Sequence, residues 1–119
     1  MSGDDERGVG TVLTAGVAMV LVVAATAASI LATWLAQVTA TQDAADLAAL
    51  AGASAMAEGF DGCAAADVAA DANQATLMEC DVRGDERAFV LEVSVRAVLQ
   101  PRLPGLPEEV VRTATAGTG

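Results

Sequence analysis

An uncharged apolar run of 25 residues, Val12 to Ala36, constrains this chain more than any other feature of its sequence. As an α-helix the run would be about 37 Å long, at about 1.5 Å per residue. The hydrocarbon core of a bilayer requires about 20 apolar residues, so the run is long enough to cross it with some tilt. A soluble helix of this length would carry a polar face, whereas only threonine, serine and glycine interrupt this one. The sequence therefore predicts one transmembrane helix over residues 12–36, with Trp34 as an interfacial anchor.

A cleaved signal peptide is the competing interpretation of the same run, with Val38-Thr39-Ala40 as its cleavage site. However, the run is far longer than the roughly 7–15 apolar residues of such a peptide. The residues before it are also acidic on balance, which is wrong for the positive start of a signal peptide. Both features favour a helix that stays in the membrane.

The flanks of the run and the two cysteines indicate its orientation. Arg7 precedes the run and no basic residue follows it until Arg83, which favours a cytoplasmic N-terminus. Cys63 and Cys80 both lie on the C-terminal side, where an oxidising compartment would join them. Such a bridge would stabilise a small domain by about 3 kcal/mol. We expect a single-pass protein of the cell membrane with three parts: a short cytoplasmic tail (1–11), the span (12–36) and an extracytoplasmic head (37–119).

The head is strongly acidic. From residue 43 onward the chain has 13 acidic residues and five arginines, a net charge of −8, and no lysine or histidine. Such a surface is repelled by phosphate backbones, so we expect no nucleic-acid partner. A solvated surface is the simplest role for these charges.

The apolar helix is expected to continue beyond the membrane to about Glu58, with Gly59 as its stop, because alanine and leucine persist and no proline intervenes. Residues at helical spacing predict the apolar face of this second half: Leu47, Leu50, Ala51 and Ala55.

Small residues recur at every fourth position along the helix. In a bilayer such patterns let two helices approach closely, and packing then drives their association. Successive members advance by about 40° and so trace a slow spiral. An alanine-rich composition is the alternative explanation. We predict a helix-packing seam, through which the chain would form a homo- or hetero-oligomer, made of Ala24, Ala28, Ala32, Ala36 and Ala40.

The rest of the head predicts a second helix and three strands. A helix fits Ala64 to Met78, with an apolar side formed by Val68, Ala69, Ala72, Thr76 and Leu77. Residues 88–99 alternate in hydrophobicity as a half-buried strand does, and residues 80–83 can pair with them through a turn at Gly84-Asp85-Glu86. Three prolines (Pro101, Pro104 and Pro107) then indicate a loop before a last strand over residues 110–116. The expected fold class is α+β, with a long helix, a short helix and a three-stranded antiparallel sheet.

Residues for catalysis are scarce, because the chain has no histidine, lysine or tyrosine. The two cysteines lack the close spacing of a redox pair, so a structural bridge is favoured. Asp81, Asp85 and Glu86 lack the spacing of an EF-hand calcium loop. We expect a protein without enzymatic activity, cofactor or metal.

Several features of the sequence form a familiar set: RGVGTVLTAGVAMVLVV, DAADLAALAGA, Cys63, Asn73, Cys80, VLEVSVRAVL and ATAG. Together they resemble the TadE-like proteins of actinobacteria, small relatives of the TadE and TadG pseudopilins from helicase and secretion loci. The resemblance implies a pilin-like outline and a pseudopilin-like role in a tight-adherence (Tad/Flp-type) pilus or a related secretion apparatus. The implied partners are other membrane proteins of that apparatus, or pseudopilins, within the lipid bilayer.

One departure from this family pattern concerns processing. Prepilins of this type have a glycine before the cleavage point and a glutamate five residues after it. Gly8 is suitably placed, but Leu13 stands at the glutamate position. Cleavage after Gly8 and entry into a filament are therefore open, and a permanently anchored accessory or tip-initiating component fits better than a major pilin. The alternative is an unrelated membrane-tethered module whose head binds an envelope partner.

Overall fold

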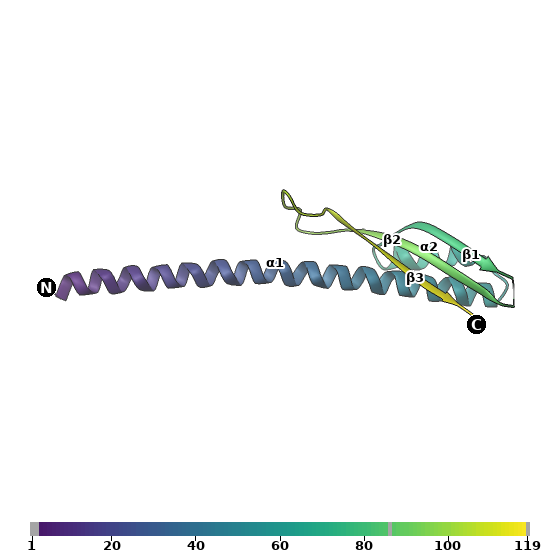
Figure 1. The fold of residues 1–119 in the computed structure, drawn as a ribbon, viewed down its shortest axis with the longest axis horizontal. Coiled ribbons are helices and arrows are strands. Elements are labelled where there is room, and N and C mark those ends of the chain that lie inside the picture. Colours follow the sequence, from purple (N-terminus) through teal and green to yellow (C-terminus); the bar gives the residue numbers. More distant parts are fainter. Residues whose placement is uncertain (1–2, 86, 119) are drawn as a thin grey trace. The chain divides into compact units, whose positions relative to one another are not determined.

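The computed structural model describes residues 3–85 and 87–118, so Glu86 of the predicted turn and calcium loop lies outside the described residues. In chain order the elements are α1 (Gly3–Ala57), α2 (Gly62–Ala72), β1 (Thr76–Gly84), β2 (Phe89–Val98) and β3 (Glu109–Gly117) (Figure 1). The chain forms two compact units, Met1–Thr33 and Trp34–Gly119, and α1 contributes to both. The predicted α+β class, with two helices and a three-stranded antiparallel sheet, is confirmed.

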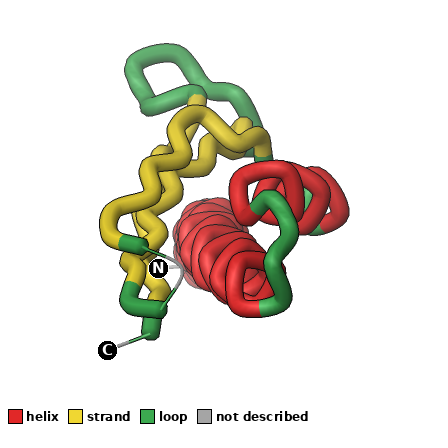
Figure 2. The backbone as a smooth tube through the Cα atoms, turned by 90° about the vertical axis from the view of Figure 1, so that its right-hand side faces the viewer, coloured by secondary structure: helices red, strands yellow, loops and turns green. Residues whose placement is uncertain are grey.

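The sheet is a simple meander in the order β1-β2-β3, with both pairs antiparallel. The central strand β2 alternates as predicted: its inward side chains are buried and the residues between them face outward. The buried members are Phe89, Leu91, Val93 and Val95. Branched side chains at every second position suit a pleated surface with one covered face. The predicted strands at 88–99 and 110–116 are confirmed, and the sheet and the helices form two layers (Figure 2).

The predicted end of the second helix is wrong, because α2 ends at Ala72 and residues 76–78 belong to β1. Gln74 has a positive φ of 61°, which a continuing α-helix does not permit. Beyond it the chain pairs with the central strand, with Thr76 opposite Arg96 and an irregularity between Leu77 and Glu79. Backbone hydrogen bonds to β2 thus extend the first strand well beyond the predicted 80–83.

The first helix ends as predicted, with its last residue at Ala57 and a positive φ of 87° at Gly59. Its predicted apolar face is wrong, because Leu47 and Leu50 are exposed. The residues that pack in the core of the head are alanines instead: Ala44, Ala45, Ala48 and Ala49. The core pairs these short side chains with the large ones of β2, and a helix surface without bulk can lie close to the sheet.

The second helix packs through glycine and alanine at every fourth position. Its buried residues are Gly62, Ala66 and Ala70, whereas Val68, predicted on the apolar side, is 71% exposed. Gly62 faces Gly52 of α1, and a Cβ atom at residue 52 would lie 2.8 Å from the Gly62 carbonyl oxygen and 2.9 Å from Leu91 Cδ1. The approach of the two helices is therefore limited by backbone atoms, which cannot move aside as a side chain can.

Replacing Gly52 by alanine is expected to destabilise the head by about 1–2 kcal/mol. Overpacking costs about 1–3 kcal/mol, and the better helix propensity of alanine offsets up to about 1 kcal/mol of this. The measurement is urea unfolding of the full chain in detergent, followed by Trp34 fluorescence. Ser54→Ala is the matched control, because Ser54 is an exposed residue of the same helix and gains propensity without overpacking. A Gly52→Ala variant as stable as Ser54→Ala would contradict the close approach.

Candidate functional site

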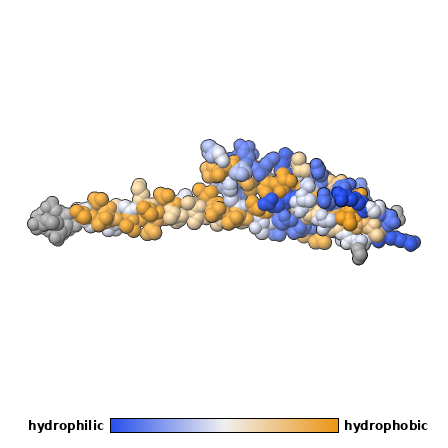
Figure 3. Space-filling view, viewed as in Figure 1, coloured by the Kyte–Doolittle hydropathy of each residue, from blue (hydrophilic) through white to orange (hydrophobic). Residues whose placement is uncertain are grey.

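The first unit consists of α1 alone and has the character of a membrane span. Within Gly8–Ala57, α1 is long and apolar enough to cross a bilayer, and its most apolar stretch is not buried in the protein. Its large apolar side chains from Val9 to Val23, and Leu31, are 59–71% exposed. Burying such a side chain is worth about 1.5–3 kcal/mol, so this surface is suited to lipid. Figure 3 shows its apolar colouring, in contrast with the hydrophilic residues that gather on the head.

The hydroxyl groups in this segment hydrogen-bond to the helix itself. Thr26 donates to the Val22 carbonyl (2.8 Å), Ser29 to Ala25 (2.9 Å) and Thr33 to Ser29 (2.9 Å). In a bilayer an unpaired hydroxyl is costly, since lipid tails offer no partner. Bonding to the carbonyl four residues earlier removes that cost. The few polar residues of the predicted span are therefore compatible with a lipid environment.

The repeat of small residues at every fourth position of α1 has different surroundings in its two halves, and the predicted packing seam is its first half. Ala24, Ala28, Ala32, Ala36 and Ala40 are all exposed in the single chain. Farther along, the same four-residue repeat continues through Ala44, Ala48 and Gly52, which are buried inside the head. The later members therefore have a role within the chain, as the close-packed side of α1. The role of the earlier members in binding another helix stays a prediction.

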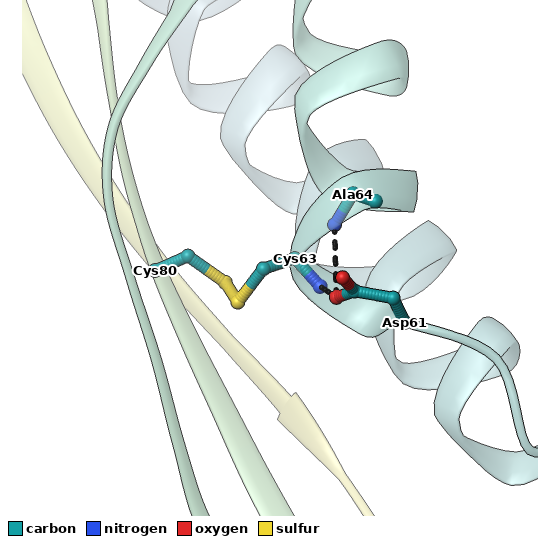
Figure 4. The surroundings of a disulfide bond; sticks show 4 residues. All are labelled: Asp61, Cys63, Ala64 and Cys80. Atoms are coloured by element: carbon teal, nitrogen blue, oxygen red, sulfur yellow. Dashed lines mark hydrogen bonds between the residues drawn. A yellow bond between two sulfur atoms is a disulfide. The ribbon is translucent and has the colours of Figure 1, made fainter.

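Cys63 and Cys80 lie at disulfide distance, with their sulfur atoms 2.11 Å apart (Figure 4). The bridge joins the first turn of α2 to the middle of β1. The Asp61 carboxylate caps this turn by accepting hydrogen bonds from the Cys63 and Ala64 N–H groups (3.0 and 3.2 Å). Two local restraints thus hold a short helix that has few large apolar side chains of its own.

Asp81 and Asp85, near the β1–β2 turn, have partners within the protein. Asp81 pairs with Arg83 at 3.0 Å on the exposed face of β1. Asp85 accepts hydrogen bonds from the Ala88 and Arg87 N–H groups, which lower the pKa of its carboxyl group. Among the side chains that the structure describes, those of residues 8–85 and 87–118, no group of three or more His, Cys, Asp or Glu residues is placed to hold a metal.

A small hollow lies on the head between α1, the end of α2 and β2. It has a volume of about 110 Å³, and its lining contains amides, a hydroxyl and apolar groups but no ionisable side chain. Its residues are Gln37, Ala40, Thr41, Asn73, Gln74, Ala97 and Val98. This hollow is well below the roughly 300–1,000 Å³ of small-molecule sites and contains no acid or base for catalysis.

Gln37 makes a contact that the sequence did not reveal. Its side-chain amide forms both hydrogen bonds of a clamp on Gln100: Nε2 donates to the Gln100 carbonyl, and Oε1 accepts from the Gln100 N–H at 2.7 Å. The two residues are 63 positions apart, so no local pattern could have indicated the pairing. The clamp fixes the start of the β2–β3 loop to α1.

Trp34 lies three residues before this clamp and is half-buried. Its indole nitrogen is buried and has no hydrogen-bond partner among residues 8–85 and 87–118. An interfacial tryptophan usually presents this N–H to headgroups or water. The anchoring role of Trp34 stays a prediction.

Comparison of the chain with family models, curated proteins and solved structures finds no match.

Proposed function

We propose that this chain is a non-enzymatic, membrane-anchored, pseudopilin-like component of a Tad/Flp-type pilus or a related secretion apparatus. The observation that carries the proposal is the organisation of α1, whose first part has a lipid-compatible surface and whose residues 34–57 form part of the core of the head. In pilin-like proteins a single helix likewise serves as both membrane anchor and core element. Two of the segments that resemble TadE-like proteins, RGVGTVLTAGVAMVLVV and DAADLAALAGA, lie on α1.

The proposed orientation places the N-terminus in the cytoplasm and residues 37–119 outside it. A protease added to intact spheroplasts is expected to remove a C-terminal tag completely, because Arg7 favours the inside and the cysteine pair requires an oxidising compartment. An N-terminal tag is the control and should stay intact until the membrane is permeabilised. Protection of the C-terminal tag would overturn the orientation.

The proposed partners bind through the exposed alanines of the packing seam. The double change Ala28→Leu/Ala32→Leu keeps the segment apolar, so insertion should be preserved. The added bulk would separate the packed helices and cost about 1–3 kcal/mol by analogy with overpacked interiors. Crosslinking in membranes, with identification of the captured protein by mass spectrometry, should therefore fall severalfold. The control Val23→Leu/Leu31→Val changes exposed side chains outside the seam and should crosslink like the parent.

The identity of the captured protein separates the two functional candidates. Pseudopilins or membrane proteins of a Tad-type secretion system, lost on the Ala28→Leu/Ala32→Leu change, would support the proposed component. Equal crosslinking by both double variants would mean that the repeat reflects composition alone. A soluble envelope protein captured by the head, with no membrane partner, would favour the tethered binding module.

A further inference from the structure

The loop between β2 and β3 has a defined shape. Its neck is closed by the Leu99 N–H, which donates to the Glu108 carbonyl at 2.8 Å. At its tip the Leu106 N–H donates to the Leu103 carbonyl at 3.2 Å, around Pro104 and Gly105. Proline followed by a glycine of positive φ, here 80°, is typical of a type II turn. The tip is therefore a fixed turn with a leucine on each side.

The tip is apolar and lacks the negative charge of the rest of the head. Leu103 and Leu106 are 36% and 41% exposed. Arg102 is the one charged residue between 99 and 107, so this segment carries +1 on a head whose net charge is −8. At the neck, Glu109 pairs with Arg96 at 3.6 Å, which offsets part of the adjoining negative charge. This segment can thus approach phosphate groups that the other surfaces would repel.

The start of the loop is held to the residue that follows the predicted span in the sequence. Gln37, which holds Gln100 through two hydrogen bonds, follows the last residue of the 12–36 run directly. A helix that crosses the bilayer with residues 12–36 places Gln37 at the membrane surface. The loop therefore starts at that level, and in Figure 1 its yellow-green trace projects beyond the end of the strands.

We propose that residues 101–107 insert Leu103 and Leu106 into the headgroup region of the same bilayer that α1 crosses. Arg102 then lies at phosphate level, since an arginine can keep its charge among headgroups while its stem covers apolar surface. Three prolines restrict the loop before it binds, so little entropy is lost on insertion. The loop gives the head a second contact with the membrane and fixes its tilt. The proposal rests on the membrane-anchored part of the proposed function and not on membership of a pilus.

The test uses tryptophan as a depth probe in the full chain. The background is Trp34→Phe, which removes no hydrogen bond among the described residues because the Trp34 indole nitrogen makes none there. Leu103→Trp and, independently, Leu106→Trp place the probe on either side of the turn. Val111→Trp is the matched control, from an exposed residue of β3. Each variant is reconstituted in phosphatidylcholine–phosphatidylglycerol vesicles with bromine near the headgroup end of the acyl chains.

We expect the brominated lipid to quench the tryptophans at 103 and 106 severalfold more than the one at 111. Aqueous acrylamide should instead quench the tryptophan at 111 more than those at 103 and 106. Vesicles of phosphatidylcholine alone should weaken the lipid quenching, because the attraction to Arg102 is then lost.

Two results would overturn the loop proposal while the chain still floats with vesicles. Acrylamide access at 103 and 106 equal to that at 111 would mean that the loop lies in water. Protection from acrylamide without lipid quenching would mean that a second copy or another protein covers the loop. A chain that fails to float would contradict the membrane anchor as well.

Discussion

Replacing Leu91 by alanine is expected to destabilise the head by about 4 kcal/mol, within the range of about 2–5 kcal/mol for buried leucines. Leu91 is fully buried in the central strand. Its Cδ1 atom lies 2.9 Å from the Cβ positions that both Gly52 and Gly62 would have, so it fills the space where the sheet and both helices meet. Alanine would lose the transfer free energy and leave a cavity. Backbone contact between the helices at the glycine pair prevents them from collapsing into it.

The measurement is the urea midpoint of the full chain in detergent, followed by Trp34 fluorescence. Val90→Ala is the matched control, because Val90 directly precedes Leu91 in β2, points to the opposite face and is 44% exposed. It should cost less than about 1 kcal/mol. Similar losses of unfolding free energy in the two variants would show that Leu91 does not form the centre of the core.

Removing the disulfide through Cys63→Ala/Cys80→Ala is expected to destabilise the head by about 3 kcal/mol, because the closed loop restricts the unfolded chain. The local effect should be largest in α2, which has 11 residues and buries only glycine and alanine. Isolated helices shorter than about 12–15 residues are marginal in water. Without the bridge, the Asp61 cap and a few small contacts are left to hold this helix.

Urea unfolding and amide hydrogen exchange measure the global and local effects respectively. Reduction of the unaltered protein should shift its midpoint to that of the double variant, and reductant should leave the variant itself unchanged. Faster exchange should be concentrated in residues 62–72. An unchanged midpoint, with exchange in α2 as slow as in the oxidised parent, would show that the bridge does not stabilise the head.

The elements predicted correctly are those with strong local signals. The uncharged run predicts the long helix because few other structures accommodate so many apolar residues in sequence. The alternation around Leu91, Val93 and Val95 predicts β2, since a period of two places these side chains on one face. The prediction that α1 stops at Gly59 was correct, because glycine readily adopts the positive φ that commonly follows the end of a helix.

The errors fall where alanine dominates. Alanine is apolar and favours helices, but its short side chain gives little indication of which face is buried. The larger Leu47, Leu50 and Val68 therefore suggested the wrong faces, since bulk was taken as the sign of burial. The predicted end of α2 was wrong for a related reason, because Thr76 and Leu77 fit both a helix and a strand locally. Pairing with β2 decided between them.

The sequence by itself determined the candidate membrane span, the α+β class, the central and last strands and the residues of the cysteine pair. It could do so because the length of an apolar run and an alternation of period two are properties of short segments, and because the cysteines can be counted directly in the sequence. Only the tertiary structure decided the Gly52–Gly62 contact, the alanine face of α1 and the clamp of Gln37 on Gln100. These contacts join residues that are distant in sequence. Elements that pack closely do so through small side chains, and the sequence pattern of small side chains gives the weakest indication of which face is buried.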